Sequence, residues 1–462
     1  PLGFCSASFG VSRFLFGFRW VGQTNFLMKT APSSREVHYE FGGPIGAALI
    51  TTSLPFVVLG LCFICGENYC LQGFRFDTLG GALEQLPGSW GDLFSPVALT
   101  ICLQWLLFQI LLDRILPGKT VDGVVLADGS RLSYKMSGHA AFWTSLVATA
   151  IGISEPGGVA STSFKLSVLY DLYAELAVAA ATISSVLSIG LYLASCRSGA
   201  KLADSAGTVG RSVIYDFYIG RELNPRIGPL DLKFFCELRP GLIGWVIINL
   251  GMMSKQREVQ GFVSASMIMV NVFQGLYVWD SLFFERAILT TMDITTEGFG
   301  FMLAFGDLCW VPFTYSLQAH YLVTRDPGLP LWAVGAISCL GLVGYAIFRG
   351  ANGQKDAFRR DPNASAVSHL QWMPTERGTK LLTSGWWGAA RKINYTGDWL
   401  MSLSWCMFAG FTSPVPYFYS IYFAVLLVHR ALRDDHACAA KYGPDWVTYK
   451  QKVPSLFVPG LF

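Results

Sequence analysis

Side chains able to bind a nucleotide gather near the C-terminal end of the chain, within residues 384–398. Trp387, Arg391, Asn394 and Asp398 follow one another at spacings of four, three and four, so they share one face if the segment is helical. An indole, a guanidinium and a carboxamide on one face could stack on a nucleotide and hydrogen-bond it. By periodicity alone, an interfacial tryptophan beside a snorkelling arginine is the commoner arrangement.

A second candidate set lies on a helix that is predicted to leave the membrane near the C-terminus and to stop at a Gly-Pro pair. Asp434 stands four residues after Arg430 and four before Cys438, and Tyr442 follows on the same side. Such a face could contact a bound cofactor. The alternative is a solvated helix beside the membrane with an ordinary ion pair.

Two cations precede these sets. Lys355 and Arg359 stand one helical turn apart, which suits the binding of a phosphate. A cytosolic basic loop that binds lipid headgroups would carry the same pair. The chain has no Walker A loop and no G-x-G-x-x-G after a strand pattern, so any dinucleotide must be held by helices.

A possible proton donor lies in the sixth predicted membrane span. Tyr277 is followed at three, seven and eight residues by Asp280, Phe284 and Glu285, so a phenol and two carboxyls could project into one cavity near the cytosolic end. A desolvated carboxyl has a raised pKa and can act as an acid. The alternative is a capping cluster at the membrane boundary.

The sequence predicts no metal site. Cys62 and Cys65 have the C-x-x-C spacing, but they lie in an apolar run without a second pair. The remaining cysteines among the eleven are interpreted mainly as buried thiols. No metal-ligand spacing connects the histidines His38, His139, His320 and His369.

The elements that must position these groups are membrane helices. Charged residues make up 14% of the 462 residues, against about 25% in soluble domains. Apolar residues reach 52% and the mean hydropathy is +0.42. This composition excludes a disordered chain and disfavours a cytosolic multidomain enzyme. The net charge of +3 gives no support for a nucleic-acid partner.

Apolar stretches predict an all-α integral membrane protein with about ten transmembrane helices, because a hydrocarbon core of about 30 Å requires about twenty apolar residues. Lysines and arginines concentrate in the loops after the even-numbered spans and in the C-terminal tail. The positive-inside rule then puts both termini and a C-terminal cofactor pocket on the cytosolic side. The predicted spans are residues 44–65, 94–116, 138–154, 176–195, 240–253, 261–279, 299–318, 329–348, 398–410 and 411–428.

Two long stretches carry a family resemblance. The first contains Tyr215-Asp216-Phe217, Gly220 and Leu223-Asn224-Pro225-Arg226, and the second contains Leu427-Val428-His429-Arg430, Arg433-Asp434, Cys438 and Lys441-Tyr442-Gly443. Both resemble the signatures of the sterol reductase family, and the likeness extends from about Tyr39 to Phe462. The run from Gly220 to Arg226, followed by Cys236-Glu-Leu-Arg-Pro240, is most similar to fungal-type delta(14)-sterol reductases and to the reductase domain of the lamin B receptor.

The resemblance implies a ten-helix protein of the endoplasmic reticulum membrane that uses NADPH to reduce a sterol double bond. The candidate cofactor set contains the positions of the family's nucleotide contacts, together with Arg391 from the spacing argument and Lys441 from the second signature. By position, the family's nucleotide contacts fall on Lys355, Arg359, Leu382, Trp387, Asn394, Tyr395, Asp434, Cys438, Tyr442 and Tyr449.

The expected reaction is reduction of the delta(14) double bond of a sterol 8,14-diene, by protonation followed by hydride transfer. Tyr277 and Asp280 are the candidates for the acid and its orienting partner, with Glu285 and Asp398 as alternatives. The alternative functions are those of a delta(7)-sterol reductase, a non-catalytic sterol-binding membrane scaffold, a carboxyl methyltransferase that acts on prenylated cysteine, and a transporter.

The chain divides into an arm and one membrane domain. Residues 1–38 are predicted to form an N-terminal arm, either disordered or added to the natural chain, and residues 39–462 to form the reductase domain. The nucleotide pocket is expected mainly within residues 350–462. The expected partners are a sterol that enters sideways from the bilayer through a lipid-facing slot, membrane lipids and other enzymes of sterol biosynthesis.

Overall fold

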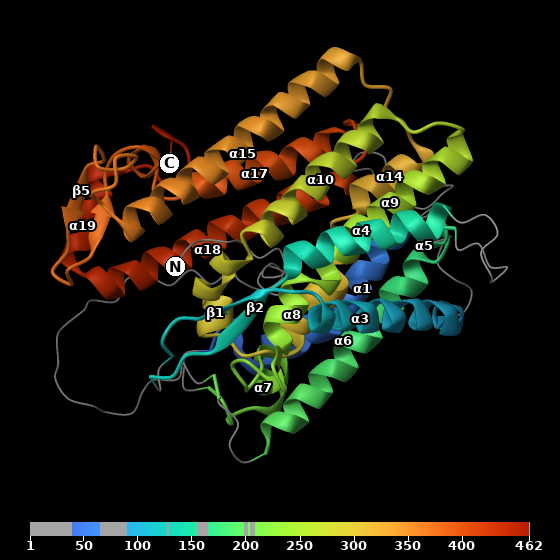
Figure 1. Ribbon diagram of the computed structural model, residues 1–462, viewed down its shortest axis with the longest axis horizontal. Coiled ribbons are helices and arrows are strands. Elements are labelled where there is room, and N and C mark those ends of the chain that lie inside the picture. The colour runs from blue at the N-terminus through green and yellow to red at the C-terminus, as the bar shows by residue number, and fades with distance from the viewer. Residues whose placement is uncertain are drawn as a thin grey trace.

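The computed structural model describes residues 39–64, 90–126, 129–154, 165–197, 202–203 and 208–461. Over these ranges the chain is mainly helical, with three small two-stranded antiparallel sheets (Figure 1). The predicted helical class is therefore confirmed. The predicted arm at residues 1–38, Cys65 of the C-x-x-C pair and most of the loop before Trp90 lie outside the described residues.

Six helical segments of the described part are long and apolar enough to cross a membrane, which makes the chain an integral membrane protein. The other four predicted spans fall on helical segments outside this set, namely α4, α10, the α12 to α14 segment and α17. The six are Gly43–Ile64, Gly91–Ile115, Tyr173–Ser195, Leu232–Gln260, Leu331–Arg360 and Val415–Tyr442.

The described part of the chain contains short strands and many helices, with the following bounds. The strands are β1 (Lys119–Asp122), β2 (Ser133–Met136), β3 (Arg226–Ile227), β4 (Leu230–Asp231), β5 (Trp372–Pro374) and β6 (Lys380–Leu382). The helices are α1 (Gly43–Ile64), η2 (Trp90–Leu93), α3 (Pro96–Ile115), α4 (Gly138–Ser154), α5 (Val168–Asp171), α6 (Tyr173–Ser195), α7 (Val213–Ile219), α8 (Leu232–Leu238), α9 (Pro240–Gln260), α10 (Ala265–Phe283), η3 (Glu285–Thr290), α11 (Met292–Thr295), α12 (Phe301–Phe305), η4 (Gly306–Trp310), α13 (Val311–Thr314), α14 (Leu317–Thr324), α15 (Leu331–Arg360), α16 (Trp386–Ala389), α17 (Ile393–Met407), η5 (Val415–Tyr417), α18 (Phe418–Tyr442) and α19 (Pro444–Lys452).

The prediction of one continuous helix over residues 299–318 is wrong, because the helix is interrupted. The segment consists of α12, a π-helical turn at η4, and then α13 and α14. Pro312 has no N–H to donate to the preceding turn, so the regular hydrogen-bond ladder cannot continue through this point. A Cβ on Gly241 of α9 would lie 1.8 Å from the carbonyl oxygen of Asp307, so α9 meets the π turn backbone to backbone.

Two helices that carry candidate residues pack closely. α15 and α17 run side by side in opposite directions, as Figure 1 shows at the top of the view, because Gly341 lies next to Ser404 while Asn352 lies next to Asn394. A Cβ on Gly397 would lie 2.6 Å from the carbonyl oxygen of Gly344, so the glycines allow the two backbones to touch. The pair forms a rigid frame for the polar groups described below.

Replacing Gly397 by leucine should force α15 and α17 apart. We expect a loss of at least about 1–3 kcal/mol in the free energy of unfolding, because the new side chain would overlap backbone atoms that cannot rotate away. Thermal unfolding of the detergent-purified protein measures the effect. The matched control is Gly335→Leu on α15, where an added Cβ meets nothing within 4 Å. Equal melting temperatures for the two variants would contradict the proposed backbone contact.

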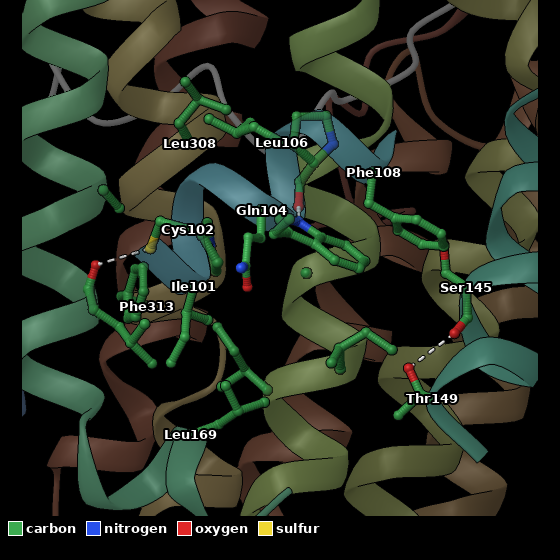
Figure 2. A pocket seen from close by; sticks show the side chains of 18 of the residues that line it. Ile101, Cys102, Gln104, Leu106, Phe108, Ser145, Thr149, Leu169, Leu308 and Phe313 are labelled. Carbon is green, nitrogen blue, oxygen red and sulfur yellow. Dashed lines mark hydrogen bonds between the residues drawn. The ribbon is translucent and has the colours of Figure 1, made fainter. Parts of the chain in front are cut away.

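A large cavity lies between α3, α4, α5, α6, α9, η4 and α13. It has a volume of about 540 Å³ and mostly apolar walls (Figure 2). Its walls include Ile101, Phe108, Leu169 and Phe313. It lies apart from the α15 and α17 pair, and its use is considered after the candidate site.

Candidate functional site

Most of the candidate residues form one polar tract along α15 and α17, and Glu285 lies outside it. α15 has 30 residues and is therefore about 45 Å long, more than the roughly 30 Å of a hydrocarbon core. Its last turns, with Lys355 and Arg359, can extend beyond the membrane. Along α15 and α17 the tract has an outer group of charges, a pair of asparagines and an inner group of carboxyls and aromatic rings.

The outer group holds three cations around one carboxylate. Lys392 donates from Nζ to Oδ2 of Asp434 at 2.6 Å, and Tyr395 donates its hydroxyl to the same oxygen at 3.3 Å. Lys355 interacts electrostatically with Lys392, Asp434 and Arg359. Three positive charges against one negative charge leave an excess that favours an anion such as a phosphate.

Aromatic rings surround this outer group. The Nζ of Lys355 lies 4.0 Å from the ring centre of Trp387, whose indole N–H donates to the carbonyl of Ala351 at 2.7 Å. The buried Leu382 packs in the same apolar cluster as Trp387. These contacts place rings and cations next to one another, as the recognition of a nucleotide requires.

The tail closes the other side of the outer group. Tyr442, Trp446 and Tyr449 pack in sequence, with ring centres 6.2 Å and 5.1 Å apart. Arg359 interacts with Tyr442 and Cys438, and Lys441 also lies in electrostatic range of Cys438. Burial raises the pKa of Tyr449 to about 12, so its hydroxyl remains a neutral hydrogen-bonding group at cellular pH. The predicted helix from the last span into this tail is confirmed, with its end at Gly443.

The predicted continuous helix from Trp387 to Asp398 is wrong. α16 ends at Ala389, and Ala390 has extended backbone angles of −156° and 150°, before α17 begins at Ile393. The break turns Arg391 toward the tail, where its Nη1 donates to the carbonyls of Val453 and Pro454 at 2.7 and 2.6 Å. Arg391 thus fastens the tail that covers the outer group.

Two asparagines connect the outer and inner groups. Asn394 donates from Nδ2 to Oδ1 of Asn352 at 3.4 Å. The Oδ1 of Asn394 and the Nδ2 of Asn352 are buried and have no hydrogen-bond partner among the described residues. Buried amides without partners cost free energy unless a ligand or water satisfies them. The pair therefore has hydrogen-bonding capacity that water or a polar ligand could fill.

The inner group contains two carboxyls and one guanidinium. Asp280 accepts from the hydroxyl of Tyr345 at 2.9 Å and forms an ion pair with Arg349. Asp398 interacts with both Asp280 and Arg349, is 1% exposed, and has no hydrogen-bond partner for either carboxylate oxygen in the described structure. With two carboxyls for one guanidinium, the group can hold a proton without an unpaired charge.

Tyr277 lies at the inner end of the tract. Its ring packs against Trp405 with ring centres 5.6 Å apart and against Trp245 with ring centres 6.3 Å apart. Asp280 follows it by one turn of α10. The structure therefore places the predicted acid and its predicted partner on one face of α10, beside aromatic rings from α9 and α17.

Glu285 belongs to a different cluster. α10 ends at Phe283, and Glu285 begins the short helix η3, where it accepts the N–H of Gly138 at 3.0 Å. Its charged neighbours are Arg239 and Asp113, which form an ion pair at 2.8 Å. The expected cavity shared by Glu285, Asp280 and Tyr277 is therefore not found, and Glu285 caps the start of α4 instead.

The Glu285 cluster makes stability depend on pH. Burial raises the pKa of Glu285 from 4.5 to about 7, although Arg239 and the Gly138 N–H act in the opposite direction. Between these values the folded chain keeps a proton that the unfolded chain has lost, so stability falls as pH rises from about 4.5 to 7. Glu285→Gln should remove up to about 3 kcal/mol of this dependence. Melting temperatures at pH 5, 6, 7 and 8 measure it, with Glu376→Gln in the exposed β5 to β6 turn as control. Parallel curves for wild type and Glu285→Gln would contradict the expectation.

Several residues of the tract are absent from the sequence-based set, among them Asn352, Tyr345 and two cations. Lys392 is one position away from the predicted face because the break at Ala390 shifts the helical register. Arg349 lies six residues, or nearly two turns, before Lys355 on α15, directly after the predicted apolar span. A search for cations spaced at one or two turns from Lys355 would have found Arg349, whereas Lys392 required the tertiary structure.

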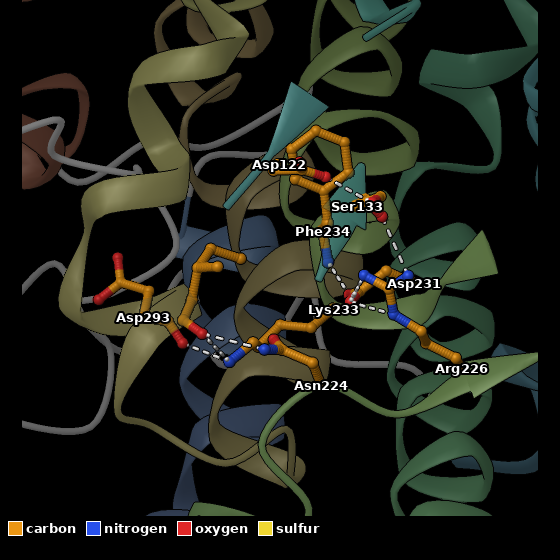
Figure 3. Close-up of polar contacts among 9 residues, drawn as sticks. Asp122, Ser133, Asn224, Arg226, Asp231, Lys233, Phe234 and Asp293 are labelled. Carbon is orange, nitrogen blue, oxygen red and sulfur yellow. Dashed lines mark hydrogen bonds and ion pairs between the residues drawn. The ribbon is translucent and has the colours of Figure 1, made fainter. Parts of the chain in front are cut away.

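The first signature belongs to the framework of the small sheets and α8 (Figure 3). Arg226 donates from Nε to Asp231 at 3.2 Å and from Nη1 to the carbonyl of Ser133 at 3.0 Å. Asp231 accepts the N–H of Phe234 at 3.0 Å and so caps α8. This arginine therefore joins two of the small sheets to the start of α8.

Lys233 and Asn224 hold the turn around α11 in the same region (Figure 3). Lys233 is fully buried and donates to the carbonyls of Asp293 and Glu297. Asn224 donates to the carbonyl of Ile294 at 3.1 Å. Arg226 and Asn224 of the first signature thus bind Asp231 and backbone carbonyls of the framework, whereas Asp434 of the second signature, on α18, belongs to the outer group. In the described part of the chain, no three or more histidine, cysteine or acidic side chains are grouped to hold a metal ion.

Comparisons with known proteins point to one class. The family model described as "Ergosterol biosynthesis ERG4/ERG24 family" matches residues 35–462. The delta(14)-sterol reductase of Schizosaccharomyces pombe is 45% identical over 440 residues, which cover 94% of this chain and 100% of that protein. The delta(14)-sterol reductase of the bacterium Methylotuvimicrobium alcaliphilum is 46% identical over 92% of this chain and 97% of its own length. The delta(14)-sterol reductase LBR of Gallus gallus is 46% identical over 92% of this chain and 64% of its own length.

Proposed function

Since the chain belongs to the ergosterol biosynthesis ERG4/ERG24 family, we propose that it is an NADPH-dependent delta(14)-sterol reductase. The resemblance predicted from the two signatures is confirmed by the comparisons, and the relatives described above are all delta(14)-sterol reductases by name. These names do not favour the delta(7) reductase, the scaffold, the methyltransferase or the transporter. The observation that carries the proposal is the polar tract, which joins an excess of cations to a deep carboxyl and phenol group.

The residues of the tract fit NADPH. Lys355, Arg359 and Lys392 would bind phosphates, because three cations face the single carboxylate of Asp434. Trp387 and the ring stack from Tyr442 to Tyr449 would contact the adenine end by stacking. The unpartnered atoms of Asn352 and Asn394 would hydrogen-bond the part of the cofactor that extends inward. NADPH supplies a hydride when bound.

The inner group would supply the proton. An electron-rich diene does not accept a hydride until it is protonated to an allylic cation, so the reaction needs an acid beside the sterol. We assign this role to the phenol of Tyr277, with Asp280 and Asp398 as the carboxyls that restore its proton. The faces of Trp245 and Trp405 beside Tyr277 would stabilise the positive charge that protonation creates on the sterol. Glu285 has no part in this step, because it caps α4.

The proposed setting is the endoplasmic reticulum membrane, with both termini in the cytosol. The lysines and arginines in the loops after the predicted even-numbered spans, and in the C-terminal tail, support this orientation. NADPH would then reach the outer group from the cytosol, while the sterol reaches the inner group from the bilayer. Neighbouring enzymes of sterol biosynthesis are proposed as partners on the same membrane.

Product analysis tests the proposal. The purified protein is given NADPH with a sterol 8,14-diene and, separately, with a 5,7-diene, and products are identified by gas chromatography and mass spectrometry. We expect loss of the 14 double bond alone. Reduction of only the 5,7-diene would make the protein a delta(7) reductase with the same tract. A protein that binds NADPH but yields neither product would favour a sterol-binding scaffold.

A further inference from the structure

The 540 Å³ cavity described above is separate from the polar tract. Pro240, Gly244 and Ile248 of α9 line it, whereas Trp245 and Asn249, on the opposite side of α9, contact Gln274. Trp245 in turn packs against the ring of Tyr277. The backbone of α9 therefore stands between the cavity and the proposed proton donor, and the cavity is not the reaction site.

The cavity has the size and walls of a site for one apolar ligand. Cavities of about 300–1,000 Å³ bury most of a drug-sized molecule. The walls come from α3, α4, α5, α6, α9, η4 and α13 and are mostly apolar, with Trp105 fixed by a 3.0 Å hydrogen bond to the carbonyl of Pro240. Lipid-depth cavities with apolar walls favour hydrocarbon ligands, because water gains no partners there.

The side chain of Gln104, an exposed residue of α3, points into this apolar space. Figure 2 shows the amide of Gln104, near the middle of α3, directed into the space between the apolar side chains. The structure records no hydrogen bond from that amide to any other described residue. An unpaired amide at the depth of the hydrocarbon core is costly. A ligand with one hydroxyl would satisfy it, because an amide both donates and accepts.

A second unsatisfied amide lies beside the same wall. Gln109 is fully buried and donates from Nε2 to the hydroxyl of Ser145, which lines the cavity, at 2.9 Å. Its Oε1 has no hydrogen-bond partner in the part of the chain that the structure describes. Gln109 does not itself line the cavity, but it holds Ser145 in the α4 wall. The hydrogen-bonding groups of the lining are therefore Gln104 on α3 and Ser145 and Thr149 on α4, and the other walls are mostly apolar.

We propose that this cavity binds a second sterol molecule, apart from the one that is reduced, with its hydroxyl on Gln104. A sterol has a rigid apolar body and one hydroxyl, which matches apolar walls with one polar wall segment. An acyl chain has no group for the amide, and its flexible body would lose more conformational entropy on binding. The inference rests on the proposed function for its ligand class, and it gives the enzyme a site at which sterol can be held without reaction.

Photolabelling tests this site independently of turnover. The protein in nanodiscs is irradiated with a sterol that carries a diazirine on its side chain, and adducts are mapped by peptide mass spectrometry. We expect adducts on peptides from α3, α4 and α6, with yields at least fivefold lower in Ala148→Trp, which fills the cavity. Leu107→Trp, on the exposed side of α3 outside the cavity, is the matched control and should label normally.

The amide is tested separately. Gln104→Leu keeps the volume but removes the hydrogen bond, so the sterol concentration for half-maximal labelling should rise about 2–13-fold. Methylating the sterol hydroxyl should have the same effect on the wild type and none on Gln104→Leu. Labelling confined to peptides around Tyr277 and Trp405, or equal labelling by a photoreactive fatty acid, would overturn the inference. If the cavity is labelled but the protein does not reduce the sterol, the proposed reductase function is wrong and the proposed sterol site is still supported.

Discussion

Replacing Tyr277 by phenylalanine is expected to reduce turnover of the 8,14-diene by about 10²–10⁴-fold, the usual contribution of a positioned acid. The variant loses one hydroxyl and keeps the ring that packs against Trp245 and Trp405. The fold and the outer group should therefore remain intact. Because the acid acts on the sterol and not on the cofactor, the Kd for NADPH should change by less than about twofold.

The control for this variant is another buried tyrosine. Tyr173 on α6 donates its hydroxyl to the carbonyl of Phe313 at 2.5 Å, away from the tract. Tyr173→Phe removes a comparable buried hydroxyl and should retain most of the turnover. Steady-state rates and NADPH titrations on both variants provide the comparison. Full turnover by Tyr277→Phe would exclude the phenol as the acid and would leave Asp280 and Asp398 as candidates.

Removing one cation from the outer group is expected to weaken NADPH binding by about 10–100-fold. Hydrogen bonds to charged groups contribute roughly 1.5–3 kcal/mol, and each 1.4 kcal/mol is a factor of ten in Kd. Lys355→Ala and Arg359→Ala each remove one charge from the group around Asp434 and Cys438. Both should also reduce the salt dependence of the Kd, because fewer charges face the phosphates.

Arg360→Ala is the matched control for the cation variants. Arg360 follows Arg359 directly, but its side chain is 78% exposed and is paired with Asp356 one turn earlier on α15. Its loss should leave the Kd for NADPH unchanged. Titration of tryptophan fluorescence at two ionic strengths measures all three variants. An equal loss of affinity in Arg360→Ala would indicate general attraction of an anion to a basic surface, and not a built phosphate site.

Local sequence patterns predicted the helices because membrane helices depend on local properties. A run of about twenty apolar residues satisfies its own backbone and the bilayer wherever it occurs. The same argument explains why α18 could be followed from the last span to Gly443, since the stop signal is a glycine at positive φ with proline after it. The irregular segment around η4 was not predictable in this way, because it depends on contact with Gly241 of another helix.

The candidate site was only partly determined by sequence. The types and spacings of Lys355, Arg359, Asp434 and Tyr442 were sufficient to predict that a nucleotide would be held by helices. Spacing within one helix says nothing about which face meets which neighbour, and Glu285 shows the consequence. It lies five residues from Asp280, yet the end of α10 directs it to the Gly138 N–H.

The amino-acid sequence by itself determined the membrane class, the approximate positions of most helices, the family and the residue types of the outer group, because each depends on composition or on short-range spacing. Tertiary structure alone decided that Lys392 pairs with Asp434, that Arg349 pairs with Asp280, and that Arg391 binds the tail. It also decided where the chain leaves a cavity behind α9. These features arise where segments distant in sequence pack together, and the packing energy of such contacts has no local signature.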